Sequence, residues 1–433
     1  MHARTVLPWG PRLPLAVQTM LWLAQPVRFP AWCHRHGDPV TLRLAGSPAV
    51  VVTREPELAW RFLTLPPEVA TAAEENAILE PLLGSRSLLM LDGPDHVRLR
   101  HLLGPFFRGE EVRGHGPAIA GMTRREVASW PRGEAFPLLP RMRALTLEVI
   151  LRVVFGLEDS PRLAELRSAL AELLGAGSSW LVPSWMRRDV PGSPWRRFLR
   201  SKARVDELLL AEVDRIAAGG RAAGVLAHLL RARDQGRLSR VELKDQLITL
   251  LVAGHETTAT SLAWSLDLLL RHPIGVERVR SERVGDAGAY LDAVVRETLR
   301  LRPVFRLASR RLRVPLEVDR WTIPAGVGVG TNVYLLHRHP ATYPDPEAFR
   351  PERHLSRVPG HAWLPFGGGV RRCLGAAFAQ FEMAAVLRCV LDEVELRPAG
   401  PEPEPVALHA VALVPKHGAR AIVPAPGSYP GPK

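Results

Sequence analysis

The chain contains few residues of two kinds that define particular protein classes. Its 433 residues include only three cysteines and four lysines. Three thiols cannot form a disulfide framework, and so small a number in so long a chain indicates a reducing compartment. No stretch reaches about 20 uninterrupted apolar residues, so the pattern of a membrane-spanning helix is absent. We therefore expect a cytoplasmic protein without a transmembrane anchor.

The N-terminal segment also lacks a secretory signal. Its most apolar stretch, residues 13–27, is interrupted by polar residues and by Pro26, and no cleavage site follows. Residues 1–30 are rich in Pro and Arg. We expect this segment to wrap around the surface of the folded protein.

The rest of the composition is that of a folded protein with a basic balance. Apolar residues make up 46% and charged residues 23%, which excludes a mostly disordered chain. The 57 Lys and Arg against 44 Asp and Glu give a net charge of +13, and nearly all these cations are arginines spread along the chain. This spread argues against a basic tail. Nucleic acid, an acidic membrane and an acidic protein all remain open as partners at this point.

Periodicity predicts a mostly helical protein with small β-sheets. Residues 56–300 carry mainly helical spacing of apolar residues, whereas 40–44 and 49–53 form a hairpin-like pair. The most informative helix begins near Arg240, because Ser239 and Glu242 form a capping-box pattern before it. About thirty residues at ~1.5 Å per residue give this helix a length of ~45 Å, enough to cross a whole domain. Short strands are predicted at 316–318, 321–323 and 327–333, and a helix at 376–391.

A glycine-rich loop carries the strongest chemical signal. Residues 365–375 read Pro-Phe-Gly-Gly-Gly-Val-Arg-Arg-Cys-Leu-Gly, and Cys373 stands directly before a predicted helix. The positive end of that helix, with Arg371 and Arg372, favours a thiolate. A thiolate in such a loop is expected to react with an electrophile or to bind a metal. The alternative is that Cys373 is a buried structural cysteine. We interpret Cys389 in that way.

This loop matches Phe-x-x-Gly-x-Arg-x-Cys-x-Gly at every fixed position and resembles the haem-ligand loop of the cytochrome P450 monooxygenases. The resemblance implies haem b (Fe-protoporphyrin IX) as cofactor and Cys373 as the proximal ligand of its iron. It also implies that the cofactor is contacted by Phe366, Gly367, Arg371 and Gly375.

Two further motifs stand where the family has them. Glu297-Thr-Leu-Arg300 supplies the family's Glu-x-x-Arg, whose charged residues lie on one helix face. Arg353 is the expected third member of a structural ion cluster, but His354 follows it where the family has Phe. The resemblance gives Glu297, Arg300 and Arg353 a structural role and leaves the packing beside them open.

The predicted long helix contains Ala253-Gly-His-Glu-Thr-Thr258. A zincin reading of His255-Glu256 fails, because Ala259 occupies the position of the second His. A core helix with a few buried hydroxyls is the other interpretation. The resemblance implies instead an oxygen-activation groove, in which Ala253 and Gly254 border the haem and Gly254 allows its close approach. Glu256 and Thr257 would then relay protons to dioxygen.

Haem carries two propionates, so cations should converge on it. His96 and Arg100 are four residues apart, on one helix face, and match the family's His-x-x-x-Arg. Arg371 is a further match. Arg310 lies where the family places another arginine, although Arg311 is an alternative.

The resemblance spans nearly the whole chain and implies one haem domain over residues 1–433, acting as a monomer. The implied reaction inserts one atom of O2 into a hydrophobic small molecule of the fatty acid, terpene, steroid or polyketide type. Electrons would come from an acidic ferredoxin or flavodoxin with its NAD(P)H reductase. Nothing in the motifs supports nucleic-acid binding.

Several features of the substrate and the reaction stay open. Family position places the substrate pocket at residues 76–89, 180–185, 250–257 and 304–307, and Arg306 could hold a carboxylate or face solvent. Two alternatives to monooxygenation remain. One is a peroxide-driven, oxidative-coupling or isomerising enzyme of the same fold, and the other is a haem sensor or carrier without turnover.

Overall fold

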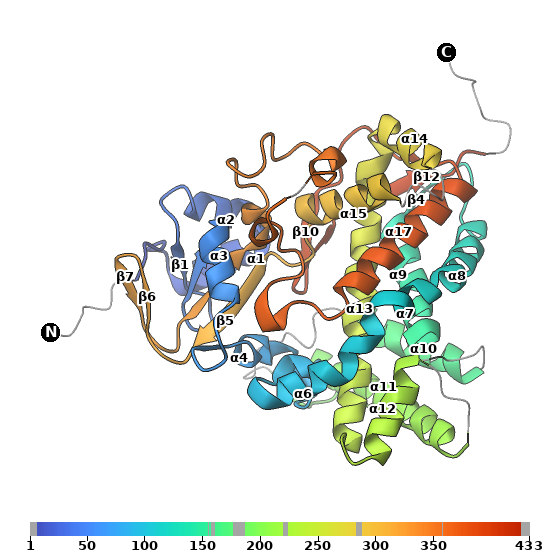
Figure 1. Cartoon of the computed structure of the whole chain (residues 1–433), viewed down its shortest axis with the longest axis horizontal. Helices are drawn as coiled ribbons and strands as arrows, with labels where there is room; N and C mark the ends of the chain where they lie inside the picture. Colours follow the sequence, from blue (N-terminus) through green and yellow to red (C-terminus); the bar gives the residue numbers. More distant parts are fainter. Residues whose placement is uncertain are drawn as a thin grey trace.

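The computed structural model describes residues 7–154, 156, 161–175, 187–219, 224–282, 288–356 and 358–425. This part of the chain is mostly helical and carries four small β-sheets (Figure 1). The predicted fold class, mostly α with small sheets, is therefore confirmed.

The helices account for most of the described chain. Their bounds are α1 (Leu15–Ala24), α2 (Arg28–Cys33), α3 (Pro56–Leu63), α4 (Ala73–Asn76), α5 (Glu80–Leu83), α6 (Gly93–Leu103), α7 (Gly109–Gly114), α8 (Gly116–Ala128), α9 (Leu138–Val149), α10 (Pro161–Gly175), α11 (Pro194–Ala217), α12 (Gly224–Asp234), α13 (Arg240–Leu270), α14 (Pro273–Ser281), α15 (Ala289–Leu301), α16 (Val333–Leu336) and α17 (Ala376–Glu393).

The longest of them, α13, organises the helical part of the molecule. It begins as predicted: the Ser239 hydroxyl accepts the Glu242 N–H at 3.1 Å, and the Glu242 carboxylate accepts the Ser239 N–H at 2.9 Å. Most of its 31 residues are buried, and it packs against α9, α15 and α17 (Figure 1). A helix that is apolar on most sides must be surrounded by other elements, which is why α13 runs through the interior.

The strands form four small sheets among the described residues. Their bounds are β1 (Val40–Leu42), β2 (Val50–Thr53), β3 (Ala70–Thr71), β4 (Ala135–Pro137), β5 (Leu307–Leu312), β6 (Leu316–Val318), β7 (Trp321–Ile323), β8 (Gly328–Asn332), β9 (Arg397–Pro398), β10 (Val406–His409), β11 (Ala412–Pro415) and β12 (Arg420–Ile422).

The largest sheet has the order β1-β2-β8-β5-β3. The predicted hairpin forms its edge, with Val40 opposite Val52, and β2 then pairs in parallel with β8. The predicted strands at 316–318 and 321–323 form a separate hairpin, β6 with β7. Strand β5 was not predicted, because Leu-Ala-Ser-Arg-Arg-Leu lacks alternation and becomes a strand only by pairing with β8 and β3.

The three cysteines differ in their burial. One large cluster of buried side chains runs through the helical part, whereas a smaller one joins the N-terminal segment to β1 and β2. Cys33 and Cys389 are buried, and Cys373 is exposed to solvent. Only Cys373 is therefore available to a ligand without rearrangement.

Candidate active site

Cys373 lies between a short 3-10 helix, η9 (Gly369–Arg371), and α17. Its own N–H donates to the Phe366 carbonyl at 2.9 Å, which closes the loop on itself. Gly369 has φ +64°, and a Cβ there would lie 2.6 Å from the Leu63 carbonyl oxygen. Glycine is required at this position because the loop passes so close to α3.

The electrostatics of Cys373 differ from the sequence-based expectation. Desolvation raises the pKa of the thiol, although the Gly375 N–H and the guanidinium groups of Arg372 and Arg100 act to lower it. The helix end and the arginine charges thus act in the expected direction, but desolvation outweighs them. A cation bound at sulfur would supply the missing charge, because a coordinating thiol loses its proton. The thiol is accessible and yet closely surrounded by protein, as a ligand inside a pocket must be.

The turn of α13 that carries Ala253 has an accessible face in the interior. Ala253 is exposed and Thr257 half-buried, whereas the following turns are almost wholly buried. The Thr257 hydroxyl donates to the Ala253 carbonyl at 2.6 Å. This bond competes with the helix's own hydrogen bonding at that carbonyl. A small side chain and a hydroxyl thus face open space in the middle of a buried helix.

Gly254 packs against a residue that the sequence did not indicate. A Cβ at this position would lie 2.3 Å from Cδ1 of Ile150, which belongs to η4 (Ile150–Val154). The missing side chain makes room for Ile150 and allows close packing between α13 and the C-terminal end of α9. The expectation that Gly254 allows close approach of the haem stays a prediction.

Glu256 is held by a residue that the sequence did not reveal. Arg143, on α9, donates from Nε to both carboxylate oxygens of Glu256, at 2.8 and 3.1 Å. One turn further on, the Thr146 hydroxyl lies 3.0 Å from Nδ1 of His255 and donates to the His255 carbonyl at 3.1 Å. Helix α9 therefore fixes both residues that precede Thr257. The separation of 113 residues explains why no local pattern indicated the Arg143–Glu256 pair.

Three arginines and one histidine from three elements gather near the thiol loop: His96 and Arg100 on α6, Arg310 on β5 and Arg371 on η9. Desolvation, with the charges of Arg371, Arg100 and Arg310, lowers the pKa of His96 to about 4. Desolvation and Arg371 also lower the pKa of Arg310 to about 10. Asp92 is the acid among them, paired with Arg371. With His96 neutral, the three arginines outnumber Asp92, and a bound dianion would balance that surplus of positive charge.

Arg310 and Arg311 differ in their partners. Arg310 donates only to carbonyls, those of Ser309 at 2.8 Å, Gly368 at 3.3 Å and Leu63 at 3.4 Å. Arg311 instead pairs with Glu75 and donates to the Gly326 carbonyl at 2.9 Å. Of the two, Arg310 lies beside the thiol loop and keeps an unbalanced charge.

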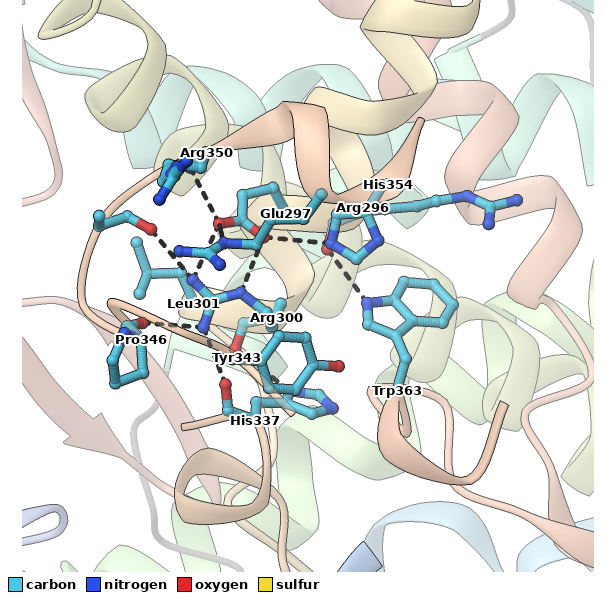
Figure 2. Close-up of polar contacts among 12 residues, drawn as sticks. Arg296, Glu297, Arg300, Leu301, His337, Tyr343, Pro346, Arg350, His354 and Trp363 are labelled. Atoms are coloured by element: carbon cyan, nitrogen blue, oxygen red, sulfur yellow. Dashed lines mark hydrogen bonds and ion pairs between the residues drawn. The ribbon is translucent and has the colours of Figure 1, made fainter. Parts of the chain in front are cut away.

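Figure 2 shows the predicted charge cluster, with Glu297 at its centre. Arg300 donates to both oxygens of Glu297, at 2.7 and 2.8 Å, and both side chains are inaccessible to solvent. Its remaining donors reach the carbonyls of His337, Pro346 and Ala348. Arg353 approaches Glu297 at 3.4 Å. Burial acts to raise the pKa of Glu297, but the hydrogen bonds from Arg300 and His354 outweigh it and hold that pKa below its usual value.

The expected pocket segments can be placed only in part. Residues 180–185 lie outside the described residues. Arg306 neither faces solvent nor is free for a carboxylate: it donates to the carbonyls of Trp22 at 2.8 Å and Pro26 at 3.2 Å, and covers the Trp22 ring at 3.8 Å. Both alternatives for Arg306 are therefore wrong, and its role is to hold the N-terminal segment.

An iron porphyrin with two propionates fits the residues of this site. An accessible sulfur is available for the metal, a surplus of cations for the carboxylates, and an accessible turn of α13 for the far side. No group of three or more His, Cys, Asp or Glu suited to a metal ion alone occurs among the described residues. A single thiol cannot hold a metal ion alone, but it can be the protein ligand of a metal that another group, such as a porphyrin, already holds.

Comparison with known proteins agrees with this geometry. A family model described as cytochrome P450 matches residues 8–420. Cytochrome P450 135B1 of Mycobacterium tuberculosis is 42% identical over 435 residues, covering 96% of this chain and 91% of that protein. Cytochrome P450 137 of the same species is 36% identical over 394 residues, covering 89% of this chain and 83% of that protein.

Solved structures show the same fold. The retinoic acid-bound cyanobacterial CYP120A1 aligns with a TM-score of 0.84 at 25% identity, covering 97% of this chain and 99% of that one. CYP175A1 from Thermus thermophilus aligns with a TM-score of 0.75 at 29% identity, covering 97% of this chain and all of the other.

Proposed function

The chain belongs to the cytochrome P450 family of haem b monooxygenases, and from this premise we propose that it inserts one atom of O2 into an apolar small molecule. One observation carries the proposal. An accessible Cys373 lies in a loop beside surplus cations, in a protein whose central helix exposes Ala253 and Thr257. A sensor or carrier would need the thiol and the cations but would have no use for the accessible hydroxyl.

The cofactor contacts follow from these positions. Cys373 would ligate the iron, and Arg310, Arg100 and His96 would face the propionates, with Arg371 divided between them and Asp92. Bound in this way, haem supplies the iron at which O2 is activated, and the thiolate ligand favours O–O cleavage. The burial of Arg310 makes its ion pair with a propionate stronger than a surface pair would be.

Proton delivery is assigned to Thr257 and Glu256. The Thr257 hydroxyl lies on the accessible face of α13 and can pass a proton from its oxygen when it leaves the Ala253 carbonyl. Glu256 is partly exposed and tied to Arg143, so its carboxylate can exchange protons with solvent. We propose that Arg143 is a positioning residue, because it determines which rotamer Glu256 adopts.

The substrate is proposed to be a hydrophobic compound of the fatty acid, terpene, steroid or polyketide type. The described pocket segments are rich in Leu, Ile and Val, and Arg306 is occupied by the N-terminal segment. No cation therefore stands ready at 304–307 to select a carboxylate. One of the similar structures is described as bound to retinoic acid, an apolar isoprenoid chain ending in an acid.

Electrons are proposed to come from a separate acidic ferredoxin or flavodoxin and its NAD(P)H reductase. Arg372 and Arg108 are exposed, and both lie close enough to Arg100 to lower its pKa. Their charges would attract an acidic partner to the thiol side of the protein, mainly by raising its association rate.

The central test is the spectrum of the reduced protein with carbon monoxide. We expect the strongly red-shifted Soret band of a thiolate-ligated haem, lost in Cys373→Ala and kept in the matched control Cys389→Ala. Turnover with isotopically labelled O2 and a surrogate reductase should then place one labelled atom in the product. A normal band with no labelled product from any apolar substrate, but activity with peroxide alone, would overturn the monooxygenase assignment and leave the peroxide-driven alternative.

A further inference from the structure

The first helix, α1, is apolar on the side that faces solvent. Its sequence Leu-Ala-Val-Gln-Thr-Met-Leu-Trp-Leu-Ala contains no charged residue. Its buried residues are Gln18 and Trp22, whereas Met20 is 58% and Leu23 54% exposed. This arrangement is the reverse of an ordinary surface helix, which turns its polar side outward.

The exposed side forms a continuous stripe. Ala16, Met20 and Leu23 are spaced by four and three residues, which places them on one face of the helix, and all three are exposed. Leu13, which precedes the helix, is exposed as well. Leu15 lies next to the stripe at 47% exposure. We call Leu13, Leu15, Met20 and Leu23 the α1 patch. Other exposed apolar side chains of the described residues, such as Ile274 and Val241, stand on separate helices and not in a row.

Polar contacts on its buried side fix the orientation of α1. The Gln18 amide donates to the carbonyls of Pro11 at 3.1 Å and Leu13 at 2.8 Å, and its oxygen accepts the Arg43 N–H at 3.3 Å. Arg306 binds the C-terminal end of α1 through the Trp22 carbonyl and ring. Because these buried contacts are polar and specific, α1 cannot roll to bury its apolar side in the protein.

The charged residues of the segment that carries the α1 patch, residues 7–37, have one sign. Between Leu7 and Gly37 the sequence contains no Asp or Glu, and Arg12, Arg28 and Arg35 are all exposed. Arg43, whose backbone lies against α1, is exposed as well. The same segment has two exposed tryptophans, Trp9 and Trp32, whose rings are 6.1 Å apart. Aromatic and cationic residues flanking an apolar surface are typical of contact with a lipid interface.

We propose that the α1 patch binds the surface of an anionic lipid membrane. The apolar side chains enter the region between headgroups and acyl chains, while the surrounding arginines contact lipid phosphates. A second copy of this chain fits less well, because face-to-face contact would bring these arginines against one another. Helix α1 has ten residues and extends about 15 Å, so it lies in the interface. None of the described helices is long and apolar enough to cross a bilayer.

The experiment is vesicle flotation of the full-length holoprotein, with phosphatidylcholine vesicles and with vesicles that also contain phosphatidylglycerol. We expect binding to the anionic vesicles that weakens as salt is added. The double variant Met20→Ser/Leu23→Ser should lower the partition coefficient on the order of tenfold or more. The control Val241→Ser/Ile274→Ser removes apolar groups that are 56% and 82% exposed from α13 and α14, and should bind like the unaltered protein.

Charge is tested separately with Arg12→Gln/Arg28→Gln, which should remove the preference for anionic vesicles. Circular dichroism and the carbon monoxide spectrum should stay unchanged in all variants, so failure of the proposed catalytic function does not affect this test. Three results would overturn the proposal: no binding to either vesicle, equal loss in the control variant, or a lipid-free dimer that Met20→Ser/Leu23→Ser abolishes. The last would assign the α1 patch to a second copy of the chain.

Discussion

Nε2 of His354 lies 3.1 Å from Oε2 of Glu297, so a histidine completes the buried ion cluster at the position where the family has a phenylalanine (Figure 2). The same ring meets Trp363 edge-on, with centroids 6.1 Å apart, and Trp363 in turn meets Phe366 at 5.9 Å. Phe366 accepts the Cys373 N–H. His354 thus connects the cluster to the thiol loop through two aromatic contacts.

Replacing His354 should destabilise the protein. His354→Phe restores the family residue but removes one partner of a buried carboxylate, so we expect a loss of about 1–3 kcal/mol in the free energy of unfolding. Urea unfolding of the holoprotein measures it. His361→Phe, at a half-buried histidine whose partner Glu57 is exposed, is the control and should leave stability nearly unchanged. Equal stability of the His354 variant would show that the hydrogen bond to Glu297 contributes nothing.

The lowered pKa of Glu297 predicts a dependence of stability on pH. Its folded-state pKa lies below the ordinary value of 4.5, so the stabilisation is fully present above that pH and is lost as the pH falls below it. Glu297→Gln should therefore be less stable at neutral pH and lose less stability on acidification. Unfolding free energies of both proteins across this acidic range test the prediction. Parallel curves would contradict it.

Gly254→Ala should be destabilising because the new methyl group would meet Ile150. The clash at 2.3 Å involves the flexible end of a side chain, so we expect a cost of about 1–3 kcal/mol. In the double variant Gly254→Ala/Ile150→Val the shorter side chain should recover part of that loss. Unfolding free energies of the two single variants and the double variant give the coupling. Additive losses would mean that the two positions do not meet.

Thr257→Ala should release more hydrogen peroxide per electron consumed, because the hydroxyl proposed to deliver protons is gone. We expect a several-fold change in the ratio of peroxide to product, on the order of 1 kcal/mol of differential stabilisation. Ser261→Ala is the matched control. Like Thr257, Ser261 donates its hydroxyl to the carbonyl four residues earlier in the helix, in this case the carbonyl of Thr257, at 3.0 Å. The same ratio in both variants would contradict the assignment of Thr257.

Arg310→Gln and Arg311→Gln should have different effects. Arg310 has only carbonyl partners, so we expect its loss to speed haem transfer to apomyoglobin about tenfold or more. Arg311 pairs with Glu75, so its loss should reduce stability and leave haem transfer nearly unchanged. The reverse result would exchange the two assignments.

Local sequence patterns determined much of this protein. The capping box at Ser239 and Glu242, the hairpin at 40–53 and the helix after Cys373 depend on residues close in the chain, and the structure has all three. The loop motif at 366–375 identified the family, because all its fixed positions lie within ten residues of the chain. The family comparison supports that identification over residues 8–420.

The tertiary structure decided where individual side chains point. Glu256 pairs with Arg143, which lies 113 residues earlier in the chain. Arg306 donates to the carbonyl of Trp22, which lies 284 residues earlier. The spacing of Gly254 in its helix could not show that Ile150 fills the space beside it. Motifs record the residues that a site needs, whereas pairings between distant elements follow from how helices and strands pack. Packing depends on the shape of the whole core, and no short segment of the sequence contains that shape.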